Sequence, residues 1–520
     1  MVPQRRAAAG FPIPRRHSVT TSIRLPRATP AEKGVDPAGI LAFLDEVAAG
    51  GLELHSFMLF RGGAVVAEGF WKPYGADRVH MQHSATKSWT AAAVGLAIGE
   101  GRFALDDKVI GFFPDQLPAQ VSDNLAAMTV RDLLTMRSGH TTGISGGEWR
   151  RMGGSWVEAF LREPVDEAPG RTFIYSSASS YMLSAIVTKV TGQTVRDYLE
   201  PRLFRPLGMG TILWDVSPEG VSSGGNGLCC VTEDVVKFGA LHLQNGVWDG
   251  RQVLPAEWVR EATRNQVDEV WMADLDGKRF RPRDPSQRSP ADRREGYGYQ
   301  WWMTPHDGYR ASGVYGQQCV VLPAQDAVIA VTAAMRNGDR RLMTALWSKL
   351  YPALAGAGPD AARLQPVLEA RLAALALPEA EGAAQSPMAA AVDSRRFVFD
   401  ANEDGVAAIA LDFAADRVVF SLSDHRGTHR IESGLGHAVE GDTTMTGNLL
   451  HHEYQPDSLR VIARGVWRDE RRLEMMWRFV ETAFCDTVTL TFGDGDVRLD
   501  RRVNTNAGPL ERPTLLGRAA

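Results

Sequence analysis

The chain has 520 residues, of which 44% are hydrophobic and 23% charged, and its formal net charge is −5 at pH 7. This composition is typical of soluble globular proteins, and the length exceeds that of one ordinary domain. The mildly acidic balance gives no indication of a nucleic-acid partner, and no apolar run reaches the ~18 residues of a membrane span. The four cysteines form no C-x-x-C pair, which predicts free thiols: Cys229, Cys230, Cys319 and Cys485.

Residues 1–30 are predicted to be a flexible N-terminal tail. The stretch is rich in Arg, Pro and Ala and lacks the continuous apolar core of a secretory signal. We therefore expect a cytoplasmic protein without a membrane partner, although a targeting role for this tail is left open.

The next segments predict a mixed α and β domain over residues 31–354. Two apolar runs at 55–60 and 64–71 flank a Gly-Gly turn and predict a β-hairpin. A helix over about 84–99 is apolar nearly all round, as expected inside a large domain. Further helices are expected over 129–136 and 178–190, and Gly224-Gly225-Asn226-Gly227 predicts close backbone packing.

The remaining segments complete this domain and add a second one. Residues 274–295, dense in Arg, Asp and Pro, predict an exposed, mobile insertion. Strands are expected over 297–303, 310–322 and 327–334. A linker with one helix (355–392), a β-rich domain built as a small barrel or sandwich (393–510) and a short tail (511–520) should follow.

The start of the 84–99 helix carries Ser84 and Lys87, spaced as S-x-x-K. One turn of helix places both side chains on the same face, and the helix N-terminus favours negative charge there. Two interpretations are open. The serine is a helix cap beside a salt-bridged lysine, or it is a nucleophile activated by a desolvated lysine.

Two later stretches offer partners for such a nucleophile. Tyr175 precedes a helix, where its hydroxyl could enter a site and a lysine cation would lower its pKa. The alternative is a core tyrosine. In Ala311-Ser312-Gly313-Val314-Tyr315-Gly316-Gln317, two glycines predict close approach of another group to the backbone, whose N–H groups could face an oxyanion. The alternative is an ordinary edge strand.

In this order, Ser84-x-x-Lys87, Tyr175-Ser176-Ser177 and Gly313-Val314-Tyr315-Gly316-Gln317 resemble the serine β-lactamase and penicillin-binding-protein superfamily. The likeness is greatest to its class C β-lactamase-related branch, with family VIII carboxylesterases, D-aminopeptidases and 6-aminohexanoate-dimer hydrolases. Residues 129–139 and 224–228 are similar as well, so that the resemblance covers about 31–354. It implies an α+β fold, an antiparallel sheet flanked by helices with a helical lobe that holds Ser84, followed by the C-terminal all-β domain.

The resemblance also implies roles. Ser84 is the nucleophile, Lys87 holds a proton and keeps Tyr175 poised as general base, and the N–H groups of Ser84 and Val314 form the oxyanion hole. Neither metal nor cofactor is required. Substrate-binding candidates complete the site: Ser177, Gly313, Tyr315, Trp149 and Trp302.

Two departures from the family pattern narrow the expected activity. Ser177 stands where the Y-x-N motif has Asn, and the K-T-G motif of true β-lactamases is missing. A decoy, Ser122-Asp123-Asn124, spells the class A S-D-N motif and is interpreted as a surface loop.

The leading hypothesis is therefore a serine hydrolase of carboxylic esters or unstrained amides acting on a small-molecule substrate. A β-lactamase or D-amino-acid peptidase, and a non-catalytic ligand-binding relative, are the alternatives. The sequence leaves the oligomeric state open.

Overall fold

A computed structural model describes residues 21–149, 152–271, 273–275, 279–288, 293–336, 339–445, 458–506 and 508–520. The chain divides into two units between Leu375 and Ala376. The predicted α+β class with a C-terminal all-β domain is confirmed. Residues 1–20 of the predicted tail lie outside the described residues.

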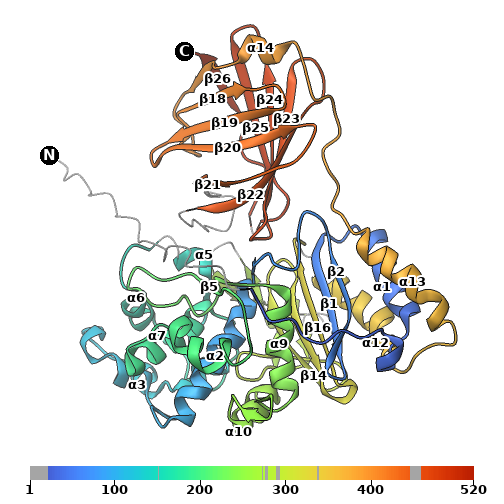
Figure 1. Cartoon of the computed structure of the whole chain (residues 1–520). Coiled ribbons are helices and arrows are strands. Elements are labelled where there is room, and N and C mark those ends of the chain that lie inside the picture. The colour runs from blue at the N-terminus through green and yellow to red at the C-terminus, as the bar shows by residue number, and fades with distance from the viewer. Residues whose placement is uncertain are drawn as a thin grey trace. The chain divides into compact units, whose positions relative to one another are not determined.

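A six-stranded antiparallel sheet organises the first unit (Figure 1). Its order is β13-β14-β15-β16-β1-β2. Nearly all residues of β1, β15 and β16 are buried, because helices cover both faces of the sheet. The strand bounds are β1 Leu54–Arg61, β2 Ala64–Phe70, β13 Trp302–Thr304, β14 Gly308–Gly313, β15 Gln317–Leu322 and β16 Ala327–Ala333.

The predicted hairpin over 55–71 is therefore confirmed, whereas the single strand expected over 310–322 is wrong. It is two strands joined by a tight turn at residues 314–316. Tyr315 and Gly316 both have positive φ, 69° and 99°, which reverses the chain there.

The helices form two groups (Figure 1). Helix α9 lies on one face of the sheet, and α1, α12 and α13 lie toward the other. The helical lobe packs beyond α9 around the buried α2. The helix bounds are α1 Pro37–Ala49, α2 Thr86–Gly99, α3 Asp123–Ala127, α4 Val130–Leu134, α5 Gly146–Trp149, α6 Trp156–Arg162, α7 Ser177–Thr191, α8 Val195–Leu199, α9 Thr232–Leu243, α10 Ala256–Thr263, α11 Asp339–Ala345, α12 Tyr351–Ala353 and α13 Ala361–Ala373.

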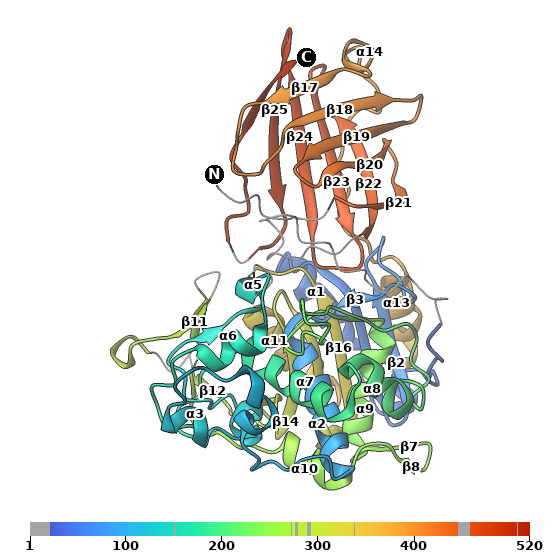
Figure 2. The ribbon, with the colours of Figure 1, turned by 90° about the vertical axis from the view of Figure 1, so that its left-hand side faces the viewer.

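The described residues of the insertion at 274–295 are largely exposed, as predicted, but part of the segment forms regular structure. Its described residues include a hairpin of β10 (Ala273–Leu275) and β11 (Arg279–Pro282), and β11 pairs with β4 (Gly143–Ile144). Figure 2 shows β11 on the same side of the unit as α5 and α6. Long-range ion pairs at Arg279 hold this hairpin in place.

The second unit is a ten-stranded sheet that closes on itself as a barrel, since β20 pairs with β22. Buried aromatic side chains fill it, with Phe420 against Trp477 at 5.1 Å between ring centroids. Its strands are β17 Arg396–Phe399, β18 Ala408–Phe413, β19 Arg417–Asp424, β20 Gly427–Leu435, β21 Val439–Thr443, β22 Leu459–Trp467, β23 Arg472–Phe479, β24 Cys485–Phe492, β25 Asp496–Val503 and β26 Leu515–Ala519.

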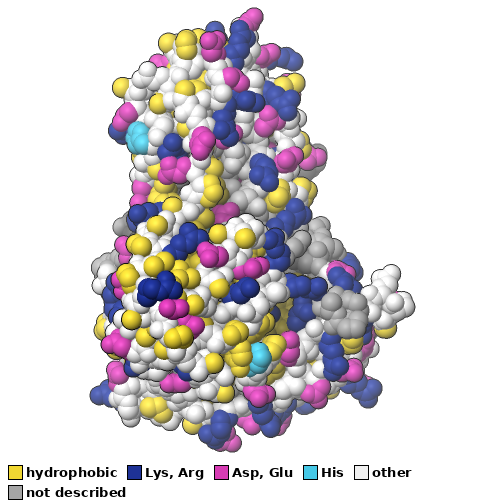
Figure 3. All heavy atoms as spheres, turned by 90° about the vertical axis from the view of Figure 1, so that its right-hand side faces the viewer, with side chains coloured by type: hydrophobic (Ala, Val, Ile, Leu, Met, Phe, Trp, Pro, Cys, Tyr) yellow, Lys and Arg dark blue, Asp and Glu magenta, His cyan; other side chains and the backbone are white. Residues whose placement is uncertain are grey.

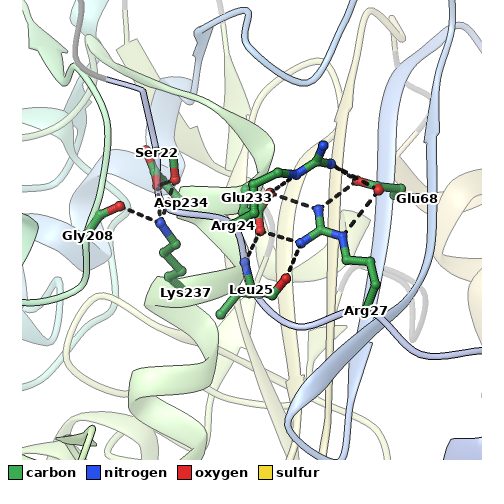
Figure 4. A network of polar contacts seen from close by, with 9 residues as sticks. All are labelled: Ser22, Arg24, Leu25, Arg27, Glu68, Gly208, Glu233, Asp234 and Lys237. Atoms are coloured by element: carbon green, nitrogen blue, oxygen red, sulfur yellow. Dashed lines mark hydrogen bonds and ion pairs between the residues drawn. The ribbon is translucent and has the colours of Figure 1, made fainter.

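The expected segment boundaries shift at three places. Residues 511–520 are no tail, because β26 pairs with β17 and β25. Helix α13 of the expected linker packs on α1 and β2 and belongs to the first unit. Residues 22–27 of the expected tail make specific polar contacts with α9 and β2 (Figure 4).

Two surface properties bear on partners. Within the described part of the chain, no helix combines the length and apolar character needed to cross a membrane. On the face drawn in Figure 3, acidic and basic side chains lie interspersed.

Candidate active site

Ser84 lies where the chain enters the buried helix α2. It occupies a 3-10 turn, His83–Ala85, and α2 begins two residues later at Thr86. Ser84 is partly exposed, whereas Lys87 is only 1% exposed. The serine is therefore accessible to solvent, and the lysine one helical turn away is buried. The sequence predicted this helix but not the tighter first turn.

The Lys87 amine contacts three oxygen atoms. Its Nζ lies 3.1 Å from Ser84 Oγ, 3.2 Å from Ser177 Oγ and 2.7 Å from the Gly225 carbonyl oxygen. Burial lowers the pKa of Lys87 to about 7. A neutral amine has one lone pair and two N–H groups. Because the carbonyl can only accept, one serine can then donate its proton toward Nζ.

The Gly-rich loop fixes the position of this amine. A Cβ on Gly225 would lie 2.8 Å from the Ser177 carbonyl oxygen, and one on Gly224 would lie 2.5 Å from that of Ser180. Thr90 Oγ1, one turn after Lys87 on α2, donates to the Gly224 carbonyl at 2.7 Å. The predicted close backbone packing is confirmed, and it presents the Gly225 carbonyl to Lys87, a role that the sequence did not indicate.

Tyr175 lies beside the same pair, just before α7. Its hydroxyl hydrogen-bonds Ser84, and Lys87 Nζ lies 4.8 Å from the centre of its ring. Burial raises the pKa of Tyr175, and the hydrogen bond to Ser84 offsets this only in part. The sequence-based expectation of a lysine cation that lowers this pKa is therefore reversed, because desolvation dominates for both groups.

The turn after β14 reaches the same place. A Cβ on Gly313 would lie 2.3 Å from the Gln82 carbonyl oxygen, so only glycine lets β14 approach the segment that carries Ser84. Gln317 braces the turn: its Nε2 donates to the carbonyls of Val314 and Ala333, and its Oε1 accepts from the Ala333 N–H. The sequence marked Gln317 only as part of a motif.

Backbone strain flanks both expected oxyanion donors. His83, immediately before Ser84, has φ of 46°, and Tyr315, immediately after Val314, has φ of 69°. Their rings meet edge to face at 5.2 Å. Non-glycine residues rarely adopt this conformation, and it clusters at functional sites.

The structure separates the two tryptophans proposed for the pocket. Trp302 lies 5.4 Å from the Tyr175 ring and is partly exposed. Trp149 instead packs against Trp156 and Tyr181 in the core. The contacts of Trp149 thus favour the alternative of a core aromatic.

The Ser122-Asp123-Asn124 decoy has a structural explanation. Ser122 is the N-cap of α3, and its Oγ accepts the Leu125 N–H at 3.1 Å. Ser122 and Asp123 are exposed.

A family model described as Beta-lactamase matches residues 44–349, which is more than half of the chain. The chain belongs to the β-lactamase family. The resemblance seen in the motifs is thereby confirmed. The matched range contains the Ser84, Lys87 and Tyr175 cluster and the β14 turn.

Individual relatives in this family carry different names. A 6-aminohexanoate-dimer hydrolase from Paenarthrobacter ureafaciens is 26% identical over 55% of this chain and 74% of its own length. Penicillin-binding protein 4 from Amycolatopsis lactamdurans is 28% identical over 62% of this chain and 86% of its own. Esterase EstB from Burkholderia gladioli is 28% identical over 30% and 43%.

Proposed function

We propose that this β-lactamase-family protein is a serine hydrolase that cleaves a carboxylic ester or unstrained amide through an acyl-enzyme on Ser84. The observation that carries the proposal is the buried Lys87 amine at 3.1 Å from Ser84 Oγ. A desolvated lysine beside a serine hydroxyl is a base for nucleophilic catalysis at neutral pH.

In acylation, neutral Lys87 accepts the Ser84 proton as Oγ bonds to the substrate carbonyl carbon. The carbonyl electron pair moves to oxygen and returns when the bond to the leaving alcohol or amine breaks. The Tyr175 hydroxyl, hydrogen-bonded to Ser84, passes a proton from Lys87 to that leaving group. Water then attacks the acyl carbon on Ser84 and gives its proton to the same pair. The bond from that carbon to Oγ breaks, the carboxylic acid leaves, and Oγ takes the proton back.

In this assignment the neutral amine is the base and the tyrosine relays protons, because burial disfavours both the lysine cation and the tyrosinate. The N–H groups of Ser84 and Val314 would hold the oxyanion. The close approach of Gly313 to the Gln82 carbonyl supports this pairing, as does the Gln317 brace on Val314.

Neutral substrates fit this strand better than β-lactams. The K-T-G strand of true β-lactamases supplies a cation for the substrate carboxylate. The cation on β14, Arg310, lies 2.8 Å from Gln318 Oε1 and 3.3 Å from Ser312 Oγ and is 9% exposed. A hydrogen bond to a charged group contributes about 1.5–3 kcal/mol. Losing one would disfavour penicillins by about 10- to 100-fold.

The names of relatives support both ester and amide chemistry, as one is a 6-aminohexanoate-dimer hydrolase and another an esterase. A relative named penicillin-binding protein keeps β-lactam acylation as an outcome to be measured.

The test is fluorophosphonate labelling followed by intact-mass and peptide mass spectrometry, on wild type, Ser84→Ala and Ser122→Ala. We expect one label on Ser84, lost only in Ser84→Ala. Ser122 is the matched control, since it heads helix α3 with Leu125 at the position that Lys87 has relative to Ser84. On the same preparations, p-nitrophenyl butyrate should exceed nitrocefin in kcat/KM.

Labelling retained in Ser84→Ala would overturn the assignment of the nucleophile. A folded wild type that neither labels nor hydrolyses any substrate would favour a ligand-binding relative. Nitrocefin turning over about tenfold faster than the ester would favour a β-lactamase.

A further inference from the structure

The β10–β11 hairpin, from the insertion, reaches the site through β4. Phe280 pairs with Gly143 across β11 and β4. Gly143 in turn packs on the Tyr175 backbone so closely that a Cβ there would lie 1.8 Å from the Tyr175 carbonyl oxygen. The register of the hairpin is thus tied to the segment that carries the tyrosine hydroxyl.

Arg279 anchors this hairpin, and every N–H group of its guanidinium donates a hydrogen bond. Arg279 Nε and Nη2 donate to both oxygens of Glu148 at 3.0 and 2.8 Å. Its Nη1 and Nη2 also bind both oxygens of Glu163, and Nη1 donates to Thr142 Oγ1 at 3.2 Å. A guanidinium has five N–H groups, so these five bonds use all of them. Two carboxylates surround this one guanidinium, so Arg279 has no N–H group left to offer a substrate.

Phe280, the residue after Arg279, contacts Tyr175. Phe280 meets the Tyr175 ring edge-on, at 5.0 Å and 90°. Trp302 covers another side of the same ring at 5.4 Å, and Phe173 packs on Trp302. Phe280 and Trp302 are both partly exposed, so each has a side not covered by the protein. The two side chains that contact the Tyr175 ring from the hairpin and from β13 are therefore both aromatic.

We propose that Phe280 is a specificity-determining residue that lines an apolar subsite next to Tyr175, and that Arg279 is the residue that positions it. The substrate class is a neutral ester or amide whose hydrocarbon group packs on this aromatic surface. The inference rests on the proposed function, because it takes Tyr175 to lie at the reacting bond. In this proposal the β10–β11 hairpin forms one wall of the substrate pocket.

The test compares size profiles instead of single activities. Two series of p-nitrophenyl-type esters are used, one varying the acyl chain from two to twelve carbons and one varying the leaving alcohol. Each methylene in an apolar pocket changes kcat/KM by about 10-fold or more. Phe280→Ala should raise the ratio of long to short substrates by at least about tenfold in one series, and Phe280→Trp should lower it.

The positioning role of Arg279 is tested by Arg279→Met, with Arg279→Lys as the conservative variant. Arg279→Met should reproduce the broadened profile of Phe280→Ala, and Arg279→Lys should recover part of it. The matched control is Arg283→Met, one residue after β11, whose guanidinium binds Asp274 at the surface. Its profile should equal that of wild type. Circular dichroism and thermal denaturation check that each variant is folded.

The two proposals fail separately. Absence of a fluorophosphonate label on wild-type Ser84 would overturn the proposed function. If Ser84 labels normally but Phe280→Ala and Phe280→Trp keep wild-type profiles in both series, the subsite is refuted. If the Phe280 variants shift the profile while folded Arg279→Met does not, the positioning role of Arg279 is refuted. Phe280→Leu replaces Phe280→Ala if the latter does not fold.

Discussion

The protonation state of Lys87 gives the sharpest prediction. A lysine with the ordinary pKa of 10.5 would be neutral in only about one molecule in 3,000 at pH 7. Burial brings the pKa of Lys87 to about 7, so about half of the molecules hold the neutral amine at that pH. Because the folded-state pKa is depressed, the basic form exists above about pH 7 and is lost as pH falls through it.

The substitution Ser177→Asp should change the pKa of Lys87. Ser177 Oγ lies 3.2 Å from Lys87 Nζ, so a carboxylate there would stabilise the cation and raise the lysine pKa by about one to three units. The acidic limb of the rate profile should move from about pH 7 to about pH 8–10. Ser177→Asn, neutral and similar in size, should leave the limb near pH 7.

The assay is the second-order rate of fluorophosphonate labelling of Ser84 between pH 5 and 11, which reports acylation without deacylation. Wild type should lose about tenfold in rate for each unit below pH 7 and reach a plateau above pH 8. A wild-type limb above pH 10 would identify Tyr175 as the base, because burial raises its pKa. An unchanged limb in folded Ser177→Asp would refute the assignment of the limb to Lys87.

Three other substitutions test separate parts of the structure. Tyr175→Phe keeps the ring packing but removes the relay, and kcat/KM should fall by about 10²–10⁴ while the melting temperature changes little. Gly313→Ala would place a Cβ 2.3 Å from a backbone carbonyl, so the labelling rate should fall at least about tenfold as β14 is displaced. Lys237→Met removes the partner of Asp234, a pair at most 1% exposed, and should cost about 3–5 kcal/mol in urea denaturation.

For each of these three predictions, one result would contradict the reasoning. Wild-type turnover in Tyr175→Phe would remove the tyrosine from proton transfer. Unchanged labelling in Gly313→Ala would show that β14 does not need its close approach. For the buried pair, Lys237→Met combined with Asp234→Asn should regain much of the lost stability; a double variant no better than the single one would mean that the charge left behind is not the cause.

The sequence was sufficient for the family and the fold class, because Ser84, Lys87 and Tyr175 lie at helix starts that local patterns reveal. It was insufficient for the hairpin at 273–282. The charged composition of residues 274–295 indicated an exposed, mobile insertion, yet Arg279 pairs with Glu148 and Glu163, which lie 131 and 116 positions away. Composition does not reveal such distant pairing.

Two further features of the site depend on the complete fold in the same way. The local sequence does not distinguish Trp149 from Trp302. Only the packing of the complete fold places Trp149 in the core and Trp302 beside Tyr175. Charge attraction from a lysine cation at Lys87 predicts a lowered pKa for Tyr175. Desolvation outweighs it, and burial depth emerges only from the complete fold.

The left-handed residues His83 and Tyr315 bear on how this enzyme could be improved. A non-glycine residue in that conformation costs about 1–3 kcal/mol, but both side chains are buried and pack on each other, and loss of a buried aromatic side chain costs about 3–5 kcal/mol, so glycine at either position should lower stability. The same glycine would widen the conformations open to the neighbouring Ser84 and Val314 amides. Selection for heat resistance is therefore expected to keep His83 and Tyr315 despite their strained backbone, and stabilising substitutions should be sought away from this site.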